Sequence, residues 1–163
     1  MAWLDLGLHL TGLWFGPDLA TRLARHLLVD PAGREQRHYA GFRPPRGHGD
    51  AAVLGAQRRM DTGFADPLTV TALASHAGLS ERSFLRRFQR ATGLTPAAYL
   101  QRLRVEKARG ALERGSDNTA EIGWAVGYRD SSAFARAFRS VTGLSPGAYR
   151  DRFRVTARQT PGP

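Results

Sequence analysis

The sequence predicts an all-α protein built from a helical unit that occurs twice. Residues 84–99 (FLRRFQRATGLTPAAY) and 134–149 (FARAFRSVTGLSPGAY) are identical at nine of sixteen aligned positions. Each copy has the order helix, glycine turn, helix, glycine stop, helix, and no stretch has the alternating pattern of a strand. Because a solenoid needs about three or more repeats, two copies instead predict two helix-turn-helix subdomains joined by a long linker helix.

The first fifty residues predict two extra N-terminal helices followed by a linker. An apolar stripe predicts a helix over residues 2–15, and Pro17 suits the first turn of a second helix that ends near residue 28. Residues 30–50 are rich in Pro, Gly and Arg and have no sustained periodicity, as is typical of a linker. We therefore expect a helical segment over residues 1–29 and a linker over residues 30–50.

Residues with a preference for helix ends bound each helix of the first repeat. Thr69 and Ser80 are suited to cap helices from their N-terminal side, and Gly78 and Gly93 are suited to left-handed turn positions. The helices expected here cover residues 51–62, about 70–77 and about 81–92.

The second repeat follows the same scheme. Thr95 and Pro96 predict the start of a long helix that Gly115 ends near residue 114. After it, Thr119 is expected to cap a helix of about 120–126, and Asp130 a helix of about 131–141. Ser145 and Pro146 begin a last helix that ends near residue 153. Residues 156–163 are polar and are expected to be a disordered tail.

The second helix of each repeat carries an apolar stripe on one side and a polar stripe on the other. In a helix-turn-helix the first helix braces the second, whose outward side chains enter the major groove of DNA. The inward stripes are Phe84, Phe88 and Ala91, and Phe134, Phe138 and Val141. The outward stripes, which can reach bases and phosphates, are Arg82, Arg86, Gln89 and Arg90, and Ser132, Arg136, Arg139 and Ser140.

The positive charge gathers on the repeated part of the chain. Residues 51–155 hold 16 Arg and one Lys against nine acidic residues, which is +8 of a total of +10. An excess of this size favours a polyanionic partner. Together with the two equivalent outward stripes, it predicts a protein that binds double-stranded DNA.

Residues 51–155 resemble the DNA-binding domain of the AraC/XylS family of bacterial transcription regulators. The resemblance rests on Ala74, Gly78 and Ser80 in the first turn, on the I-x-x-x-V-G-Y motif of residues 122–128, and on the G-L-S/T-P-x-x-Y close of both repeats. It implies sequence-specific DNA binding in the cytoplasm, with RNA polymerase as a partner and a homodimer as a possible state. By family position, the base-facing residues are Arg82, Leu85, Arg86, Ser131, Ser132 and Arg136.

The first 31 residues, which we call the leader, are similar to the closing stretch of a PfpI-like domain, which is related to class I glutamine amidotransferases. The similar residues are Leu4–Leu10 and Ala24–Pro31. In one AraC subfamily such a domain precedes the DNA-binding domain. The resemblance implies that the chain holds the tail of a sensor domain followed by an intact DNA-binding domain.

Two other function classes fit the sequence less well. For an enzyme, the five histidines form no ligand pair, no nucleophile or phosphate-binding motif is present, and the chain has no cysteine; we expect no catalytic residue, metal site or cofactor. The alternative is a protein-interaction or membrane-surface module using the apolar leader. A surface-seeking helix normally carries basic residues on its polar face, whereas the leader has none before Arg22. The apolar stretch of the leader is also too short to span a bilayer, and we expect no membrane partner.

Overall fold

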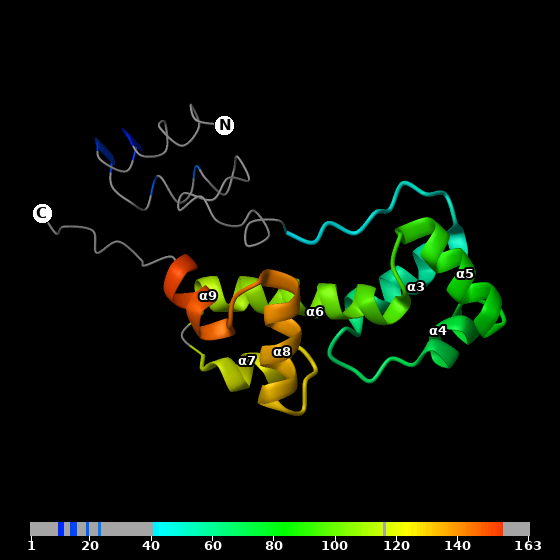
Figure 1. Cartoon of the computed structure of the whole chain (residues 1–163). Helices are drawn as coiled ribbons and strands as arrows, with labels where there is room; N and C mark the ends of the chain where they lie inside the picture. The colour runs from blue at the N-terminus through cyan, green and yellow to red at the C-terminus, as the bar shows by residue number, and fades with distance from the viewer. Residues whose placement is uncertain are drawn as a thin grey trace, which may run out of the picture. The chain divides into compact units, whose positions relative to one another are not determined.

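The computed structural model of the chain describes residues 41–115 and 117–154, together with Leu10, Thr11, Trp14, Phe15, Leu19 and Leu23 (Figure 1). The chain divides into two compact units, Met1–Gly41 and Phe42–Pro163. The six described residues of the leader are helical. Most of the two helices expected at residues 2–15 and 17–28 lies outside the described residues, as does the tail expected at 156–163.

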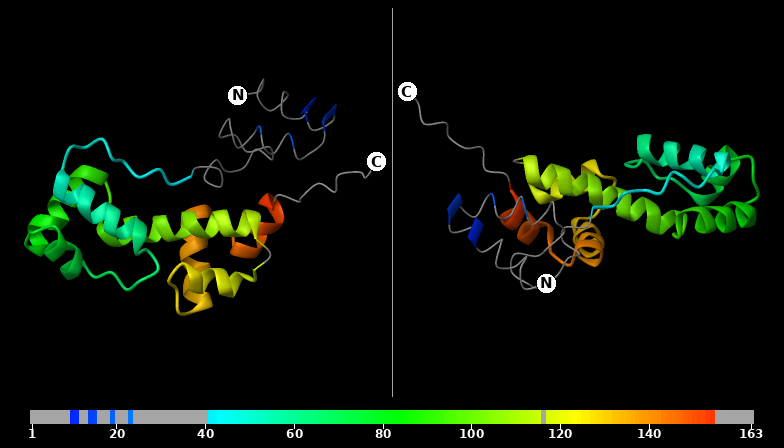
Figure 2. Two further views of the ribbon diagram at one scale, coloured as in Figure 1. Left: turned by 180° about the vertical axis from the view of Figure 1, so that it is seen from behind. Right: turned by 90° about the horizontal axis from the view of Figure 1, so that it is seen from above.

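The described part of the second unit is helical and contains no strand. Figures 1 and 2 show the long helix α6 running between two groups of shorter helices, with α3–α5 toward one end and α7–α9 toward the other. The predicted fold class, two helix-turn-helix subdomains joined by a long helix, is therefore confirmed. The helices are α3 (Ala51–Thr62), α4 (Val70–His76), α5 (Glu81–Thr92), α6 (Pro96–Arg114), α7 (Thr119–Ala125), α8 (Ser131–Thr142) and α9 (Pro146–Phe153).

Capping side chains fix where these helices begin, and five of the caps are those expected from the sequence. The side chains of Thr69, Ser80, Thr95, Asp130 and Ser145 each accept a hydrogen bond from a backbone N–H in the first turn of their helix. Gly93 and Gly143 end α5 and α8 in the left-handed conformation, with φ of 72° and 81°.

The expected cap of α7 was wrong by one residue. Asn118, not Thr119, is the N-cap: its Oδ1 accepts the N–H of Glu121 at 2.8 Å, and the Glu121 carboxylate accepts the N–H of Asn118 at 3.1 Å. This reciprocal capping box satisfies two N–H groups at once, whereas a cap at Thr119 would place Ile122 rather than Glu121 three residues on. Thr119 is instead the first helical residue.

Each subdomain has an aromatic core in which the second repeat copies the first. In the first, the Phe88 ring lies 5.3 Å from that of Tyr99 at 84°. In the second, the Phe138 ring lies 5.3 Å from that of Tyr149 at 79°. Such edge-to-face pairs are the favoured packing of aromatic rings. These four residues are at most 3% exposed, so the identical aromatic positions form the core of each repeat.

Helix α6 belongs to both subdomains. Its first half closes the first core through Tyr99 and Leu103. Its second half repeats the buried pattern of α3, with matching buried residues 52 positions later. The pairs are Val53 and Val105, Ala56 and Ala108, Gln57 and Arg109, and Met60 and Leu112. The repeated unit is therefore four helices long, and α6 is the last helix of one copy and the first of the next.

Residues 42–50, the C-terminal part of the segment expected to be a linker, pack against the first subdomain. We call Phe42–Asp50 the strap. Its Phe42 ring contacts the Tyr99 ring edge-on at 5.1 Å, and the Phe42 N–H donates to Glu106 at 3.0 Å. The buried Gln57 amide donates to the carbonyl of Pro45 at 2.9 Å and to the hydroxyl of Tyr99 at 3.2 Å. These contacts place the strap within the second compact unit.

Among the described residues, none of the helices has the length and apolar character needed to cross a bilayer.

Candidate nucleic-acid interface

Helix α5 presents the outward stripe of the first repeat to solvent. Phe84 and Phe88 are fully buried, and this anchors one side of the helix in the core. Because residues three and four apart share a face of a helix, the opposite side must point away from the core. The five residues expected to face DNA from this helix are all exposed: Arg82, Leu85, Arg86, Gln89 and Arg90.

Helix α8 repeats this arrangement with fewer charges. Phe134 and Phe138 are buried, and the four expected DNA-facing residues are exposed: Ser131, Ser132, Arg136 and Arg139. Asp130 caps the helix by accepting the N–H groups of Ala133 at 2.8 Å and Ser132 at 3.1 Å. These hydrogen bonds lower the pKa of the Asp130 carboxyl, so it remains anionic near neutral pH. Its charge lies 4.0 Å from Arg136, on the outward side of the helix.

Most of the outward guanidinium groups make no polar contact with the described part of the chain. Among the described residues, Arg82, Arg86, Arg90 and Arg139 have no hydrogen bond or ion pair. A side chain without an internal partner loses no protein contact when it binds a phosphate or a base edge. The two stripes are therefore available to a polyanion, with most of the charge on α5.

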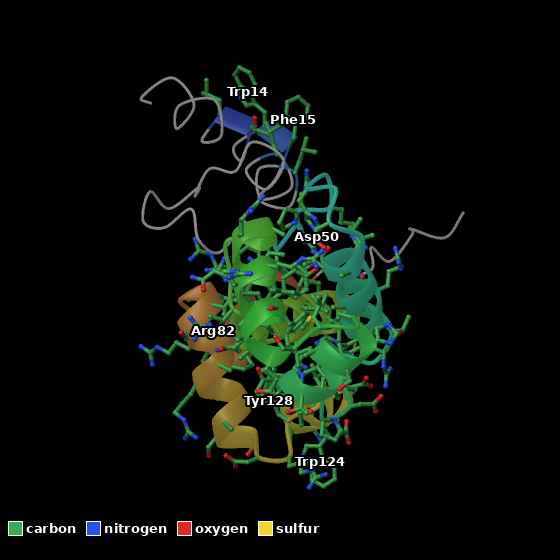
Figure 3. All side chains as sticks on the ribbon, turned by 90° about the vertical axis from the view of Figure 1, so that its right-hand side faces the viewer. Trp14, Phe15, Asp50, Arg82, Trp124 and Tyr128 are labelled. Atoms are coloured by element: carbon green, nitrogen blue, oxygen red, sulfur yellow. The ribbon has the colours of Figure 1, made fainter. Side chains whose placement is uncertain are left out.

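Helices α5 and α8 lie toward the same side of the second unit when it is viewed along α6 (Figure 3). Figure 3 looks along the long direction of α6, because it is turned by 90° from Figure 1, in which α6 runs across the view. In this projection Arg82 of α5 and the ribbon of α8 both lie to the left. Two recognition helices on one side of a long helix can reach successive major grooves of one duplex.

Two exposed apolar side chains belong to the helix-turn-helix elements. Leu85, in the α5 stripe, is 38% exposed, and Trp124, on α7, is 70% exposed (Figure 3). By family position, Leu85 is expected to face a base. Its exposure among the outward arginines leaves it free to contact a methyl group in the major groove.

The structure adds an ion pair that periodicity did not reveal. Arg87 lies between the inward and outward stripes of α5, and its guanidinium donates to the Asp50 carboxylate at 2.9 Å from Nε and 2.8 Å from Nη2. Asp50 belongs to the strap and also caps α3. The strap therefore contacts the recognition helix of the first repeat directly, a long-range pairing with no local sequence signal.

In the described part of the chain, no group of three or more His, Asp or Glu side chains is placed to hold a metal ion. His48 shares a 3.0 Å hydrogen bond with the Gln57 amide oxygen and accepts the N–H of Asp50. It thus serves to hold the strap.

A family model described as a helix-turn-helix domain matches residues 73–152. Among curated proteins, the chain is similar to the HTH-type transcriptional activator RhaS of Escherichia fergusonii, with 39% identity over 69 residues. That alignment covers 42% of this chain and 25% of the relative, so the chain spans about a quarter of the length of the curated relatives it matches.

Solved structures agree with this match over a longer stretch. The DNA-binding domain of AdpA, solved in complex with a target DNA, is 31% identical, with a TM-score of 0.59 over 61% of this chain and 90% of that one. A regulator from Chromobacterium violaceum, described by its AraC-type DNA-binding domain, is 25% identical, with a TM-score of 0.62 over 72% of this chain and all of that one. The C-terminal domain of the response regulator AraT from Geobacillus stearothermophilus is 25% identical, with a TM-score of 0.65 over 69% and 93%.

Proposed function

Because residues 73–152 belong to the AraC-type helix-turn-helix DNA-binding domains, we propose that this protein binds a specific double-stranded DNA sequence through α5 and α8 and regulates transcription there. The observation that carries the proposal is the pair of equivalent, exposed, positively charged stripes on α5 and α8. The AdpA domain, solved with its target DNA, supports the proposal because this chain covers 90% of it.

The two helices are proposed to contribute unequally. Helix α5 offers Arg82, Arg86 and Arg90, and arginine can grip guanine through two hydrogen bonds. Helix α8 offers two serines at its start, and its Arg136 lies near the Asp130 carboxylate. We therefore assign most of the sequence selectivity to α5 and weaker contacts to α8.

The first experiment measures affinity for duplex DNA as a function of salt. If about 5–8 phosphates are neutralised, the slope of log affinity against log salt concentration is expected to be about −5 to −7. A slope near zero would show that the positive charge does not serve DNA binding.

The second experiment separates base reading from general charge. Arg86→Ala is expected to weaken binding by about 1–3 kcal/mol on the preferred sequence and to relax the preference at one half-site. The matched control is Arg58→Ala, which removes the same charge from an exposed position on α3. Equal losses for the two variants on every sequence would make Arg86 a nonspecific contact.

The leader is proposed to be the end of a PfpI-like domain and to mediate self-association. The described leader residues Trp14, Phe15, Leu19 and Leu23 are between 38% and 73% exposed, and apolar groups exposed together favour association. A homodimer would bring two DNA-binding domains to paired sites and raise their avidity. Light scattering on the full chain and on a chain beginning at Phe42 tests this, because the dimer should be lost only from the shorter chain.

Regulation itself is tested with a promoter. We propose that the bound protein acts in the bacterial cytoplasm and contacts RNA polymerase, as the family resemblance implies. In a reconstituted transcription reaction, a promoter carrying the selected site should change its output when the protein is added, and a promoter with a scrambled site should not. An unchanged output at a fully occupied site would restrict the proposal to DNA binding.

A further inference from the structure

A single side chain at the middle of α6 joins the two subdomains. The guanidinium of Arg104 donates from Nε to the carbonyl of Phe64 at 2.7 Å and from Nη2 to the carbonyl of Asp66 at 3.0 Å. Both acceptors lie in the loop between α3 and α4, in the first subdomain. From Nη1 it also donates to the carbonyl of Gly127 at 3.2 Å, in the turn between α7 and α8. The Arg104 guanidinium therefore binds backbone carbonyl groups of both subdomains.

The same two loops also touch each other directly. Gly127 has a φ of +89°, and a Cβ built on it would lie 2.5 Å from the carbonyl oxygen of Ala65. Its counterpart in the first repeat, Gly78, also has a positive φ (+65°), but a Cβ there would meet nothing within 4 Å. Glycine at position 127 thus allows a left-handed turn, as in the first repeat, and also leaves room for the backbone of the loop at Ala65.

Arg104 and the two loops also contact residues that belong to the cores beneath α5 and α8. The Arg104 guanidinium carbon lies 5.5 Å from the centroid of the Tyr128 ring, within the range of a cation–π interaction. The Tyr128 ring in turn lies 5.5 Å from that of Phe134, the inward anchor of α8. On the other side, Phe64 packs against the core that buries Phe88 of α5. We refer to Arg104, the loop 64–66 and the turn 127–128 as the joint.

We propose that Arg104 is a positioning residue that fixes the rotation and spacing of α5 relative to α8, and so sets the number of base pairs between the two half-sites. The proposal rests on the proposed function, because it concerns how two DNA-reading helices are held together. Without the Arg104 side chain, the subdomains are connected through α6 and the direct contact of the loop 64–66 with the turn 127–128. Inserting one base pair moves the second half-site by about 3.4 Å and turns it by about 35°, so a rigid protein must discriminate against the insertion.

The test compares Arg104→Ala with the wild-type full chain on a set of duplexes. The parent duplex carries the sequence selected by the wild type, and its derivatives have one or two base pairs inserted or deleted between the half-sites. The matched control is Arg102→Ala, which removes the same charge from an exposed position on α6 two residues away. Arg104→Lys keeps the charge but not the planar fork that reaches three carbonyl groups.

The wild type and Arg102→Ala are expected to lose affinity at least about tenfold for one inserted base pair, because the second helix no longer meets its groove. Arg104→Ala is expected to bind the parent duplex about tenfold more weakly, since the two readers are less pre-organised, and to lose only about twofold more on insertion. Arg104→Lys should lie between them. An Arg104→Ala profile as steep as that of the wild type would overturn the proposal.

A second measurement tests the joint without DNA. The sequence has no cysteine, so cysteines introduced at Ser75 on α4 and Ala120 on α7, both exposed, can each carry a spin label. The distribution of distances between the labels should broaden with Arg104→Ala and stay narrow with Arg102→Ala. An unchanged width would overturn the proposal. If the wild type does not bind DNA but the width of the distance distribution still depends on Arg104, the proposed function is overturned and the role of the joint is supported.

Discussion

Asp50, the last residue of the strap, makes two kinds of interaction through one carboxylate, and its substitution tests both. Its Oδ1 accepts the N–H of Val53 at 3.1 Å and so caps α3. Both oxygens accept hydrogen bonds from Arg87 of the recognition helix α5, at 2.8 and 2.9 Å. Asp50→Ala removes the cap and the ion pair, whereas Asp50→Asn keeps a good capping oxygen and removes the charge.

The two contributions can be estimated separately. Replacing an N-cap by Ala costs about 1 kcal/mol of stability. The ion pair is partly open to solvent, with side-chain exposures of 40% for Arg87 and 19% for Asp50, and a screened pair of this kind contributes about 0.5–1 kcal/mol. Asp50→Ala should therefore cost about 1.5–2 kcal/mol and Asp50→Asn about 0.5–1 kcal/mol. For a folded unit of about 100 residues the first corresponds to a Tm lower by about 6–10 °C.

The assay is thermal unfolding of the full chain followed by helical circular dichroism, with Asp151→Asn as the control. Asp151 is exposed on α9 and loses the same charge. The hydrogen bonds from Arg87, followed by that from the Val53 N–H, lower the pKa of Asp50 in the folded protein. A depressed pKa stabilises the fold at pH above the unfolded value of about 3.9. This stabilisation is lost as the pH falls through the lower, folded pKa.

The difference in stability between wild type and Asp50→Asn should therefore be constant from neutral pH to about pH 5 and shrink at more acidic pH. Two results would refute the reasoning. If Asp50→Asn and Asp50→Ala are equally destabilised, the cap contributes nothing. If the wild-type advantage persists at pH 2, it does not come from the charge. A double-mutant cycle with Arg87→Ala should then assign the coupling, which we expect to be about 0.5–1 kcal/mol.

Two further predictions concern the core and the corrected cap. Phe88→Ala should lower the free energy of unfolding by about 3–5 kcal/mol because it empties a fully buried site. Leu85→Ala, on the exposed side of the same helix, should change it by less than about 0.5 kcal/mol. Comparable losses for the two variants in urea unfolding would contradict the inward and outward assignment. Asn118→Ala should lower the free energy of unfolding by about 1 kcal/mol through loss of the capping box, and Thr119→Ala should lower it much less. The same urea unfolding measurements compare the two variants. The reverse order would restore Thr119 as the cap.

Local signals in the sequence were sufficient for most helix ends and for the outward stripes. A capping hydroxyl or carboxylate satisfies backbone N–H groups within three residues of itself, and a left-handed glycine acts at its own position. Both are visible in a short window of sequence. The misplaced start of α7 came from considering the cap residue alone, because Thr119 and Asn118 are both acceptable caps. The choice depended on Glu121, three residues after Asn118, which completes a reciprocal pair with it and is also a local signal.

The sequence alone determined the all-α class, the tandem repeat, the seven helices described in the second unit and the outward side of α5 and α8, because each follows from periodicity and from contacts between near neighbours. Only the tertiary structure decided what the strap and the joint do. Asp50 meets Arg87 across 37 positions of sequence, and Arg104 meets Phe64 across 40. An arginine has the same appearance in a sequence whether it faces solvent, as Arg86 does, or holds three backbone carbonyls, as Arg104 does. Which of these occurs depends on the path of chain segments that no local pattern records.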